Sequence, residues 1–245
     1  MKNFELISFA NPDELAQAVA GAWLREIEAA SRAGQSHFVA LSGGRIARKF
    51  FAAAAALAKA GAVPMQSVHF FWADERCVPP DSAESNFRLT RELLLAPLKI
   101  PDDHIHRIRG EAEAKLAATE AEAEIRRVAP LDASGQPVLD LIFLGMGEDG
   151  HVASLFPGEP EAVMASRPVY RTVTAPKPPP RRVTLGYAAI AAARQVWVLA
   201  SGPDKEAALH QSLNPAGQTP LARVLQQRSF SKVFTNIRHA GFKPR

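Results

Sequence analysis

The sequence predicts an α/β fold in which a mainly parallel sheet is covered by helices on both faces. The first observation is an alternation of short, β-rich apolar runs with longer stretches rich in Ala, Leu, Glu and Arg. The second is that the short runs are apolar almost throughout, as in strands buried on both faces, whereas the longer stretches repeat apolar residues at helical spacing. The third is the shortage of flexible linkers and repeats, which favours one domain over residues 1–245.

Apolar runs and cap residues give the expected elements in chain order. Asn11 is a suitable N-cap for a first helix over residues 13–33. Apolar residues recur every four positions in that helix and predict a buried face, formed by Leu15, Val19, Trp23 and Ile27. We expect strands at 37–41, 68–73, 139–144 and 195–200, and further helices at 85–95, 112–128 and 204–212.

Composition and charge exclude several classes of protein. Of the 245 residues, 47% are hydrophobic and 22% are charged, which is typical of a globular chain and not of a disordered one. The formal net charge of +4 is too small to indicate nucleic-acid binding. The single cysteine, Cys77, cannot form an internal disulfide, and the first fifteen residues lack the apolar run of a secretory signal.

The longest apolar stretches are interrupted by lysines well short of the ~18 residues that suggest a membrane span. We therefore expect a cytoplasmic protein with no membrane partner. The oligomeric state is left open by the sequence, which is compatible with a monomer.

Candidate site residues should directly follow the apolar runs, because ligands of open α/β sheets bind beyond the carboxyl ends of the strands. Ser42, Gly43 and Gly44 follow the first run. Glycine lets backbone N–H groups approach an anion, and the next helix presents its positive end there. A tight strand-to-helix turn would use the same residues, so both interpretations stay open.

The second run ends in Asp74, Glu75 and Arg76. Two acids and an arginine can orient a polyhydroxylated substrate, or they can hold one another in an ion pair. A little further on, Ser85 and Asn86 have the composition of a helix N-cap.

The strongest candidate follows the third run, where G-M-G-E-D-G-H brings three glycines and then Asp149 and His151. Histidine titrates near neutral pH and can take a proton from water, while a neighbouring carboxylate can fix its tautomer. The pattern predicts a general base. The alternative is a turn in which Asp149 and His151 cap the next helix.

Arg182 and Lys205 come later in the sequence, and their charges could bind a phosphate that also contacts residues 42–44. The alternative is that each is a solvated surface residue. His104 and His106 form an isolated pair without acids at ligand spacing, so we expect no metal. A G-x-S-x-G elbow is missing, which disfavours an acyl-serine route.

Taken together, these segments resemble the family of 6-phosphogluconolactonases and glucosamine-6-phosphate isomerases/deaminases. The matching stretches occur in the expected order over most of the chain: LSGG, FWADERCVPPDSAESN, LIFLGMGEDGHVASLFPG, APKPPPRRVTLG and SGPDKEAAL. The central GMGEDGHVASLFPG is long and highly specific. The resemblance implies a Rossmann-like fold, hydrolysis of 6-phospho-D-glucono-1,5-lactone in the oxidative pentose phosphate pathway, and no redox cofactor.

The resemblance also implies residue roles. His151 would activate water and later protonate the leaving ring oxygen, with Asp149 orienting it. Arg76 would contact the substrate or the developing oxyanion, and Asp74 would order the site. The phosphate would lie on residues 42–44, with Arg182 and Lys205 supplying charge; the role of Lys177 is left open.

Two departures from the family pattern are visible. The usual phosphate loop, SGGSTP, reads S-G-G-R-I-A here, so a pair of hydroxyls and a proline are missing. Arg45 either pairs with the phosphate or points to solvent while backbone N–H groups bind the anion. At the C-terminus, VFTNIRHAG replaces the family's final helix with its tryptophan and aspartate, which we expect to affect packing and not chemistry.

Within the family, the alternative is an amino-sugar phosphate isomerase/deaminase. Its corresponding loop resembles AFNEP and carries a glutamate, whereas residues 153–157 read ASLFP here and Phe156 cannot transfer a proton. This difference favours the lactonase.

Two further alternatives belong to other classes. Asp74, Arg76, Asp149 and His151 argue against a catalytically silent sugar-phosphate binder, because such a protein has no evident need of a base. A nucleic-acid module is suggested only by the basic tail, which lacks a recognised binding motif, so we expect no nucleic-acid partner. The tail consists of Lys232, Arg238, His239, Lys243 and Arg245.

Overall fold

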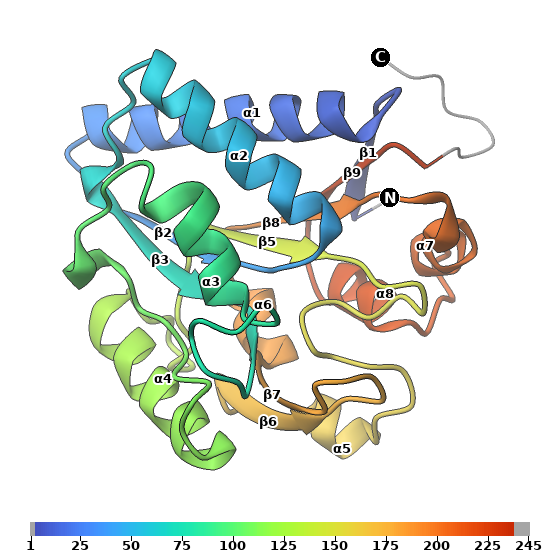
Figure 1. Cartoon of the computed structure of the whole chain (residues 1–245). Helices are drawn as coiled ribbons and strands as arrows, with labels where there is room; N and C mark the ends of the chain where they lie inside the picture. The colour runs from blue at the N-terminus through green and yellow to red at the C-terminus, as the bar shows by residue number, and fades with distance from the viewer. Residues whose placement is uncertain (1–2, 238–245) are drawn as a thin grey trace.

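A six-stranded parallel sheet forms the centre of the computed structural model, which describes residues 3–237 (Figure 1). Its order is β1-β9-β8-β5-β2-β3. The strands are β1 (Phe4–Ser8), β2 (His37–Leu41), β3 (Val68–Trp72), β5 (Leu141–Gly145), β8 (Gln195–Ala200) and β9 (Ser231–Thr235). The four predicted strands are confirmed and lie side by side, whereas β1 and β9 were missed.

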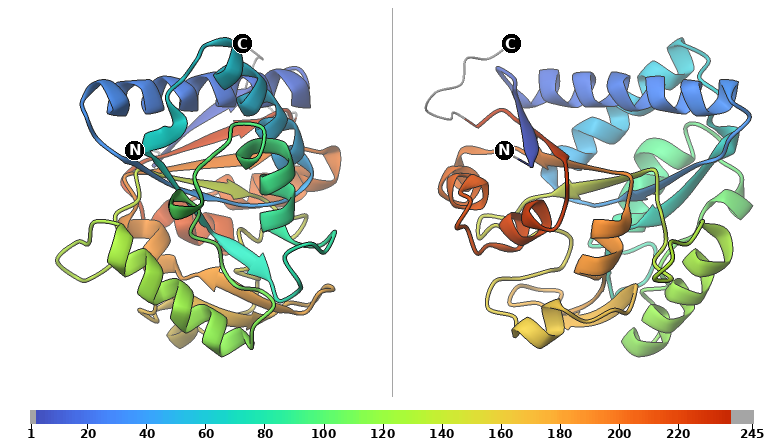
Figure 2. Two further views of the ribbon diagram at one scale, coloured as in Figure 1. Left: turned by 60° about the vertical axis from the view of Figure 1, so that its left-hand side comes forward. Right: turned by 180° about the vertical axis from the view of Figure 1, so that it is seen from behind.

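Helices cover both faces of this sheet, as predicted. On one face lie α1 (Pro12–Arg32) and α2 (Arg45–Ala60), and on the other lie α6 (Tyr187–Ala192) and α8 (Pro220–Gln226) (Figures 1 and 2). The remaining helices are α3 (Asn86–Thr90), α4 (Ala114–Val128), α5 (Glu161–Met164) and α7 (Glu206–Leu213). In residues 3–237, none of these helices has the length and apolar character needed to cross a membrane.

The first helix begins as its sequence predicts. The side-chain oxygen of Asn11 accepts hydrogen bonds from the backbone N–H groups of Asp13 (3.0 Å) and Glu14 (2.9 Å). These bonds satisfy two N–H groups that have no partner within the helix. The predicted apolar face is fully buried, and Trp23 packs against Phe143 of β5 with ring centroids 5.4 Å apart.

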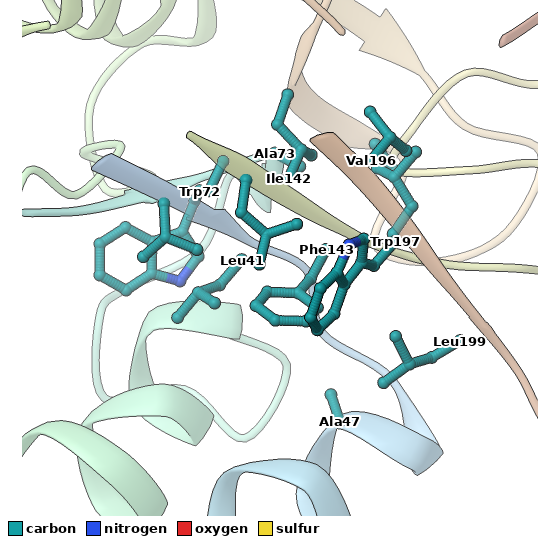
Figure 3. Close-up of a cluster of buried hydrophobic side chains, with 14 of the residues drawn as sticks. Leu41, Ala47, Trp72, Ala73, Ile142, Phe143, Val196, Trp197 and Leu199 are labelled. Carbon is teal, nitrogen blue, oxygen red and sulfur yellow. The ribbon is translucent and has the colours of Figure 1, made fainter. Parts of the chain in front are cut away.

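Aromatic packing joins that face to the sheet. Phe143 also contacts Trp197 of β8, with ring centroids 5.7 Å apart, and Figure 3 shows the two rings side by side above Ala47 of α2. Burying each such side chain contributes about 1.5–3 kcal/mol. The central strands are therefore rigidly placed, and the loops that leave their carboxyl ends start from a rigid base.

A second, antiparallel sheet was not predicted. It has the order β4-β7-β6, formed by β4 (Asp74–Arg76), β7 (Arg181–Leu185) and β6 (Tyr170–Thr174), and α4 packs against it. The chain passes from one sheet to the other at Ala73. Its backbone N–H donates to the carbonyl of Leu41 in β2, and its carbonyl accepts from the N–H of Leu185 in β7. This second sheet pairs Arg76 with Arg182, so it brings two candidate site residues together.

Residues 231–235 form β9, between β1 and β8, so the start of the VFTNIRHAG segment is a strand of the central sheet. Lys232 lies over the ring of Trp197, with its ammonium 4.9 Å from the ring centroid. This lysine therefore belongs to the sheet. The other residues of the predicted basic tail, Arg238, His239, Lys243 and Arg245, lie outside the described residues.

Three histidines gather at the edge strand β3. Nδ1 of His69 lies 3.0 Å from Nε2 of His106, and the rings of His69 and His104 stack with centroids 4.2 Å apart. Glu124 of α4 lies 2.7 Å from Nδ1 of His106, so the expectation of an isolated pair without acids is wrong in three dimensions. Within residues 3–237, no group of His, Cys, Asp and Glu side chains has the geometry to hold a metal ion.

We predict that this histidine cluster weakens the fold in mild acid. Burial and the neighbouring histidines lower the pKa of His69 to about 4, and burial lowers the pKa of His106. The unfolded chain, with histidine pKa values near 6.5, takes up protons first, so the free energy of unfolding falls as the pH drops from about 6.5 towards about 4. Urea unfolding of wild type and His69→Gln should therefore give a smaller pH dependence for the variant. Parallel curves would contradict the prediction.

Candidate active site

A pocket of 230 Å³ opens at the carboxyl ends of the central strands. It lies where the strand order changes direction, because β2 leads outwards to β3 while β5 leads to β8 on the other side. Nine of the ten predicted site residues line it: Ser42, Gly43, Gly44, Arg45, Asp74, Arg76, His151, Arg182 and Lys205. The tenth, Asp149, does not line the pocket but forms a hydrogen bond with the ring of His151.

The loop after β5 presents His151 to the pocket. Nδ1 of His151 donates to Oδ1 of Asp149 at 2.5 Å, and the backbone N–H of His151 donates to the same oxygen at 3.2 Å. A carboxylate only accepts, so in the neutral form of the ring the proton is on Nδ1 and the lone pair is on Nε2. Burial acts to raise the pKa of Asp149, but the charge and hydrogen bonds of His151 outweigh it and the pKa lies below its usual range.

The capping alternative for these two residues is wrong. The chain runs on as a loop after His151, and the next helix, α5, begins only at Glu161. The Asp149–His151 pair is therefore a feature of the pocket wall.

The ring of His151 rests against the backbone of Gly147. A Cβ atom at Gly147 would lie 2.0 Å from Nδ1 and Cε1 of the ring, so a side chain there would displace it. On another side, the ring of Phe156 lies 4.8 Å from the imidazole centroid, and Arg182 lies over that phenyl ring at 5.6 Å. The imidazole is thus held by its neighbours as well as by Asp149.

Asp74 is buried, with 4% of its surface exposed, and joins three segments. Its Oδ2 accepts from the hydroxyl of Ser154 at 2.7 Å, and Asn86 donates to its backbone carbonyl at 2.9 Å. The N–H of Ser154 donates in turn to Thr184 of β7 at 3.2 Å. The carboxylate therefore ties the His151 loop to α3 and to the second sheet. Ser154 was not predicted, because nothing in the local pattern distinguishes it from any serine in a loop.

The side chains of the D-E-R run that forms β4 make different contacts. The carboxylate of Glu75 accepts from the N–H groups of Asn86 (2.8 Å) and Phe87 (2.7 Å), at the start of α3. Burial raises the pKa of Glu75 in spite of these bonds. The guanidinium of Arg76 instead reaches the pocket and lies 3.9 Å from Glu84, so the acid that pairs with it is not a neighbour in the run.

The other end of the pocket is open to an anion. The hydroxyl of Ser42 donates to the carbonyl of Phe143 at 2.9 Å and joins β2 to β5. Gly43 must be glycine, because a Cβ there would lie 1.9 Å from the side-chain oxygen of Asn86. Gly44 caps α2 without any side-chain hydrogen bond, and the first turn of α2 has no acid. The first N–H groups of this helix are therefore left for a ligand.

Cations outnumber acids around the pocket. Burial and repulsion from Arg76 lower the pKa of Arg182. Burial and repulsion from Arg45 lower the pKa of Lys205 in the same way. An anion between them would offset both effects. The cationic residues of the lining are Arg45, Arg76, Lys177, Arg182 and Lys205, and the acidic ones are Asp74 and Glu148.

Arg45 lines the pocket, and its two alternatives, pairing with a phosphate or pointing to solvent, stay predictions. Its guanidinium forms an ion pair with Asp204, which lies in the short 3₁₀ turn Pro203–Lys205 after β8. Asn86 and Glu148 also line the pocket and were not predicted, and Lys177, whose role was left open, lines it too. Asn86 was interpreted only as a helix start, and the direction of a side chain cannot be derived from local pattern.

Comparisons with known proteins agree with the motif resemblance. A model of the family "Glucosamine-6-phosphate isomerases/6-phosphogluconolactonase" matches residues 10–234. A probable 6-phosphogluconolactonase 3, chloroplastic, of Oryza sativa subsp. indica is 36% identical over 185 residues, covering 71% of this chain; the match spans 57% of the rice protein's length. A 6-phosphogluconolactonase of Streptomyces coelicolor is 33% identical over 221 residues, covering 87% of this chain and 84% of the relative.

A solved structure is similar along the whole chain. The 6-phosphogluconolactonase from Trypanosoma brucei has a TM-score of 0.83 and 30% identity, with 96% of each chain covered. Motifs, family model and fold thus lead to one conclusion: the chain belongs to the family of glucosamine-6-phosphate isomerases and 6-phosphogluconolactonases.

Proposed function

We propose that the protein hydrolyses 6-phospho-D-glucono-1,5-lactone to 6-phospho-D-gluconate, in the oxidative pentose phosphate pathway. The observation that carries this proposal is one pocket with two chemically different ends. His151, oriented by Asp149, supplies a base at one end, and the start of α2 with Lys205 supplies an anion site at the other. A phosphorylated lactone has the matching pair of groups, an electrophilic ester carbonyl and a phosphate.

In the proposed reaction, Nε2 of His151 takes a proton from a water molecule as its oxygen attacks C1 of the lactone. The C1 carbonyl becomes an oxyanion, which the guanidinium of Arg76 stabilises. When the intermediate collapses, the bond from C1 to the ring oxygen breaks and the imidazolium returns its proton to that oxygen. The product is an open-chain hydroxy acid, which ionises at neutral pH.

The remaining residues bind and position. Asp74 holds Ser154 and Asn86, so it keeps the His151 loop at the correct distance from Arg76. Residues 42–44 bind the phosphate through backbone N–H groups, and Arg182 and Lys205 neutralise its charge. Holding the phosphate fixes the lactone carbonyl relative to His151.

The amino-sugar deaminase is the weaker alternative. The ring of Phe156, which stands where that activity uses a glutamate, contacts His151 and Arg182 and has no proton to transfer. Release of ammonia from glucosamine 6-phosphate would favour the deaminase over the lactonase. A cytoplasmic location, a monomeric state and the lack of nucleic-acid and membrane partners stay predictions.

His151→Ala is expected to lower kcat for lactone hydrolysis by about 10²–10⁴-fold, the usual contribution of a general base. Binding of 6-phosphogluconate should change little, because the anion end is untouched. The measurement is hydrolysis of freshly generated lactone above the spontaneous rate, with calorimetry for binding and His210→Ala, on the exposed side of α7, as the control. A fully active His151→Ala would rule out the base. If wild type binds 6-phosphogluconate without accelerating hydrolysis, the protein is the silent binder.

Gly147→Ala is expected to lower kcat by about 100-fold while the protein stays folded, because a displacement of about 1 Å at the reacting centre costs that much. The added methyl group would overlap the His151 ring. Gly21→Ala is the matched control, since its methyl group would meet only the tip of Arg25 at 3.6 Å on the surface of α1. The measurements are kcat and the melting temperature of both variants. A wild-type kcat in Gly147→Ala would contradict the proposed ring position.

A further inference from the structure

The ion pair between Arg45 and Asp204 joins two loops at the mouth of the pocket. Arg45 is the first residue of α2, and its side chain lines the pocket. Asp204 comes from the turn after β8 and directly precedes Lys205, another lining residue. Between them lies Gly202, where a Cβ would meet the carboxylate of Asp204 at 2.4 Å and the guanidinium of Arg45 at 3.8 Å. The pair therefore lies directly beside the anion end of the pocket.

This pair is exposed. The side chain of Arg45 is 71% exposed and that of Asp204 is 33% exposed. Exposed ion pairs contribute little to stability, because water solvates both charges nearly as well as they solvate each other. Exchange of Asp204 for another anion therefore costs little, and a phosphate dianion offers the guanidinium more charge and two oxygens for paired hydrogen bonds.

The charges around Arg45 favour such an exchange. Lys205 and Arg45 repel each other, and both cations interact with the carboxylate of Glu148. A bound dianion would neutralise Lys205 and attract Arg45 inwards. Asp204, which does not line the pocket, would then lose its partner and be solvated by water.

We propose that Arg45 leaves Asp204 when substrate binds and pairs with its phosphate, so that Asp204 competes with the phosphate and sets the affinity for phosphorylated substrates. The inference rests on the proposed function for the identity of the substrate. It assigns to Asp204 an effect on KM that is opposite in sign to that of Arg45.

The test measures KM and kcat in wild type, Arg45→Ala, Asp204→Asn and the double variant. Each is assayed with 6-phosphogluconolactone and with unphosphorylated glucono-1,5-lactone. Arg45→Ala should raise KM for the phosphorylated lactone by about 10-fold, the loss of one charge-assisted contact. Asp204→Asn should lower it by about 2- to 5-fold, the range of an exposed ion pair. In the Arg45→Ala background, Asp204→Asn should have a much smaller effect.

Controls separate this exchange from general effects of charge. Arg48→Ala removes a cation from the same helix outside the pocket and should leave both KM values unchanged. The KM for unphosphorylated lactone should not respond to Arg45→Ala, because that substrate has no phosphate.

Two outcomes would overturn the proposal. If Asp204→Asn raises KM as Arg45→Ala does, Asp204 holds Arg45 in its binding position and no exchange occurs. If Arg45→Ala leaves KM unchanged, Arg45 does not contact the phosphate. Calorimetry with 6-phosphogluconate on the same four proteins keeps the test independent of turnover. A wild type that binds this ligand without hydrolysing the lactone would refute the proposed function, and the pattern of Kd values would still decide on the exchange.

Discussion

The buried carboxylate of Asp74 is the contact on which the rest of the site depends. Asp74 is the first residue of β4, and its carboxylate accepts hydrogen bonds from the side chains of Ser154 and Asn86. Three segments therefore meet at one charge. A buried carboxylate is costly unless hydrogen bonds satisfy it, and removing one of its partners would leave that cost uncompensated. The same bonds hold the His151 loop at a set distance from Arg76. The position of His151 and the stability of this region therefore depend on the same bonds.

The change of strand order between β2 and β5 explains why the pocket has two chemically different ends. Loops from neighbouring strands lead to opposite edges of the sheet and leave a crevice between them. The loop after β2 supplies backbone N–H groups at the start of α2, and the loop after β5 supplies the Asp149–His151 pair. Phe143 packs against Trp23 and Trp197, so β5, which the Asp149–His151 loop follows, is held against α1 and β8.

The pocket concentrates positive charge that the protein alone does not neutralise. Arg182 and Lys205 are nearly buried, and burial lowers the pKa of both. Close, buried positive charges cost stability, and a bound anion would offset that cost. Ion pairs at the rim, Arg45 with Asp204 and Arg76 with Glu84, moderate this charge without filling the pocket.

By itself, the sequence determined the central strands, the capped first helix, the glycine loop with its Asp149–His151 pair and the family. These features are local, because hydrophobic periodicity, cap residues and closely spaced glycines are all patterns within a short stretch of sequence. It missed β1, β9 and the second sheet, whose short strands mix polar and apolar residues and are defined by their partners. Only the tertiary structure decided that Ser154 bonds Asp74 across 80 positions and that Arg45 pairs with Asp204 across 159. Such contacts depend on where packing directs each side chain, and local pattern does not contain that information.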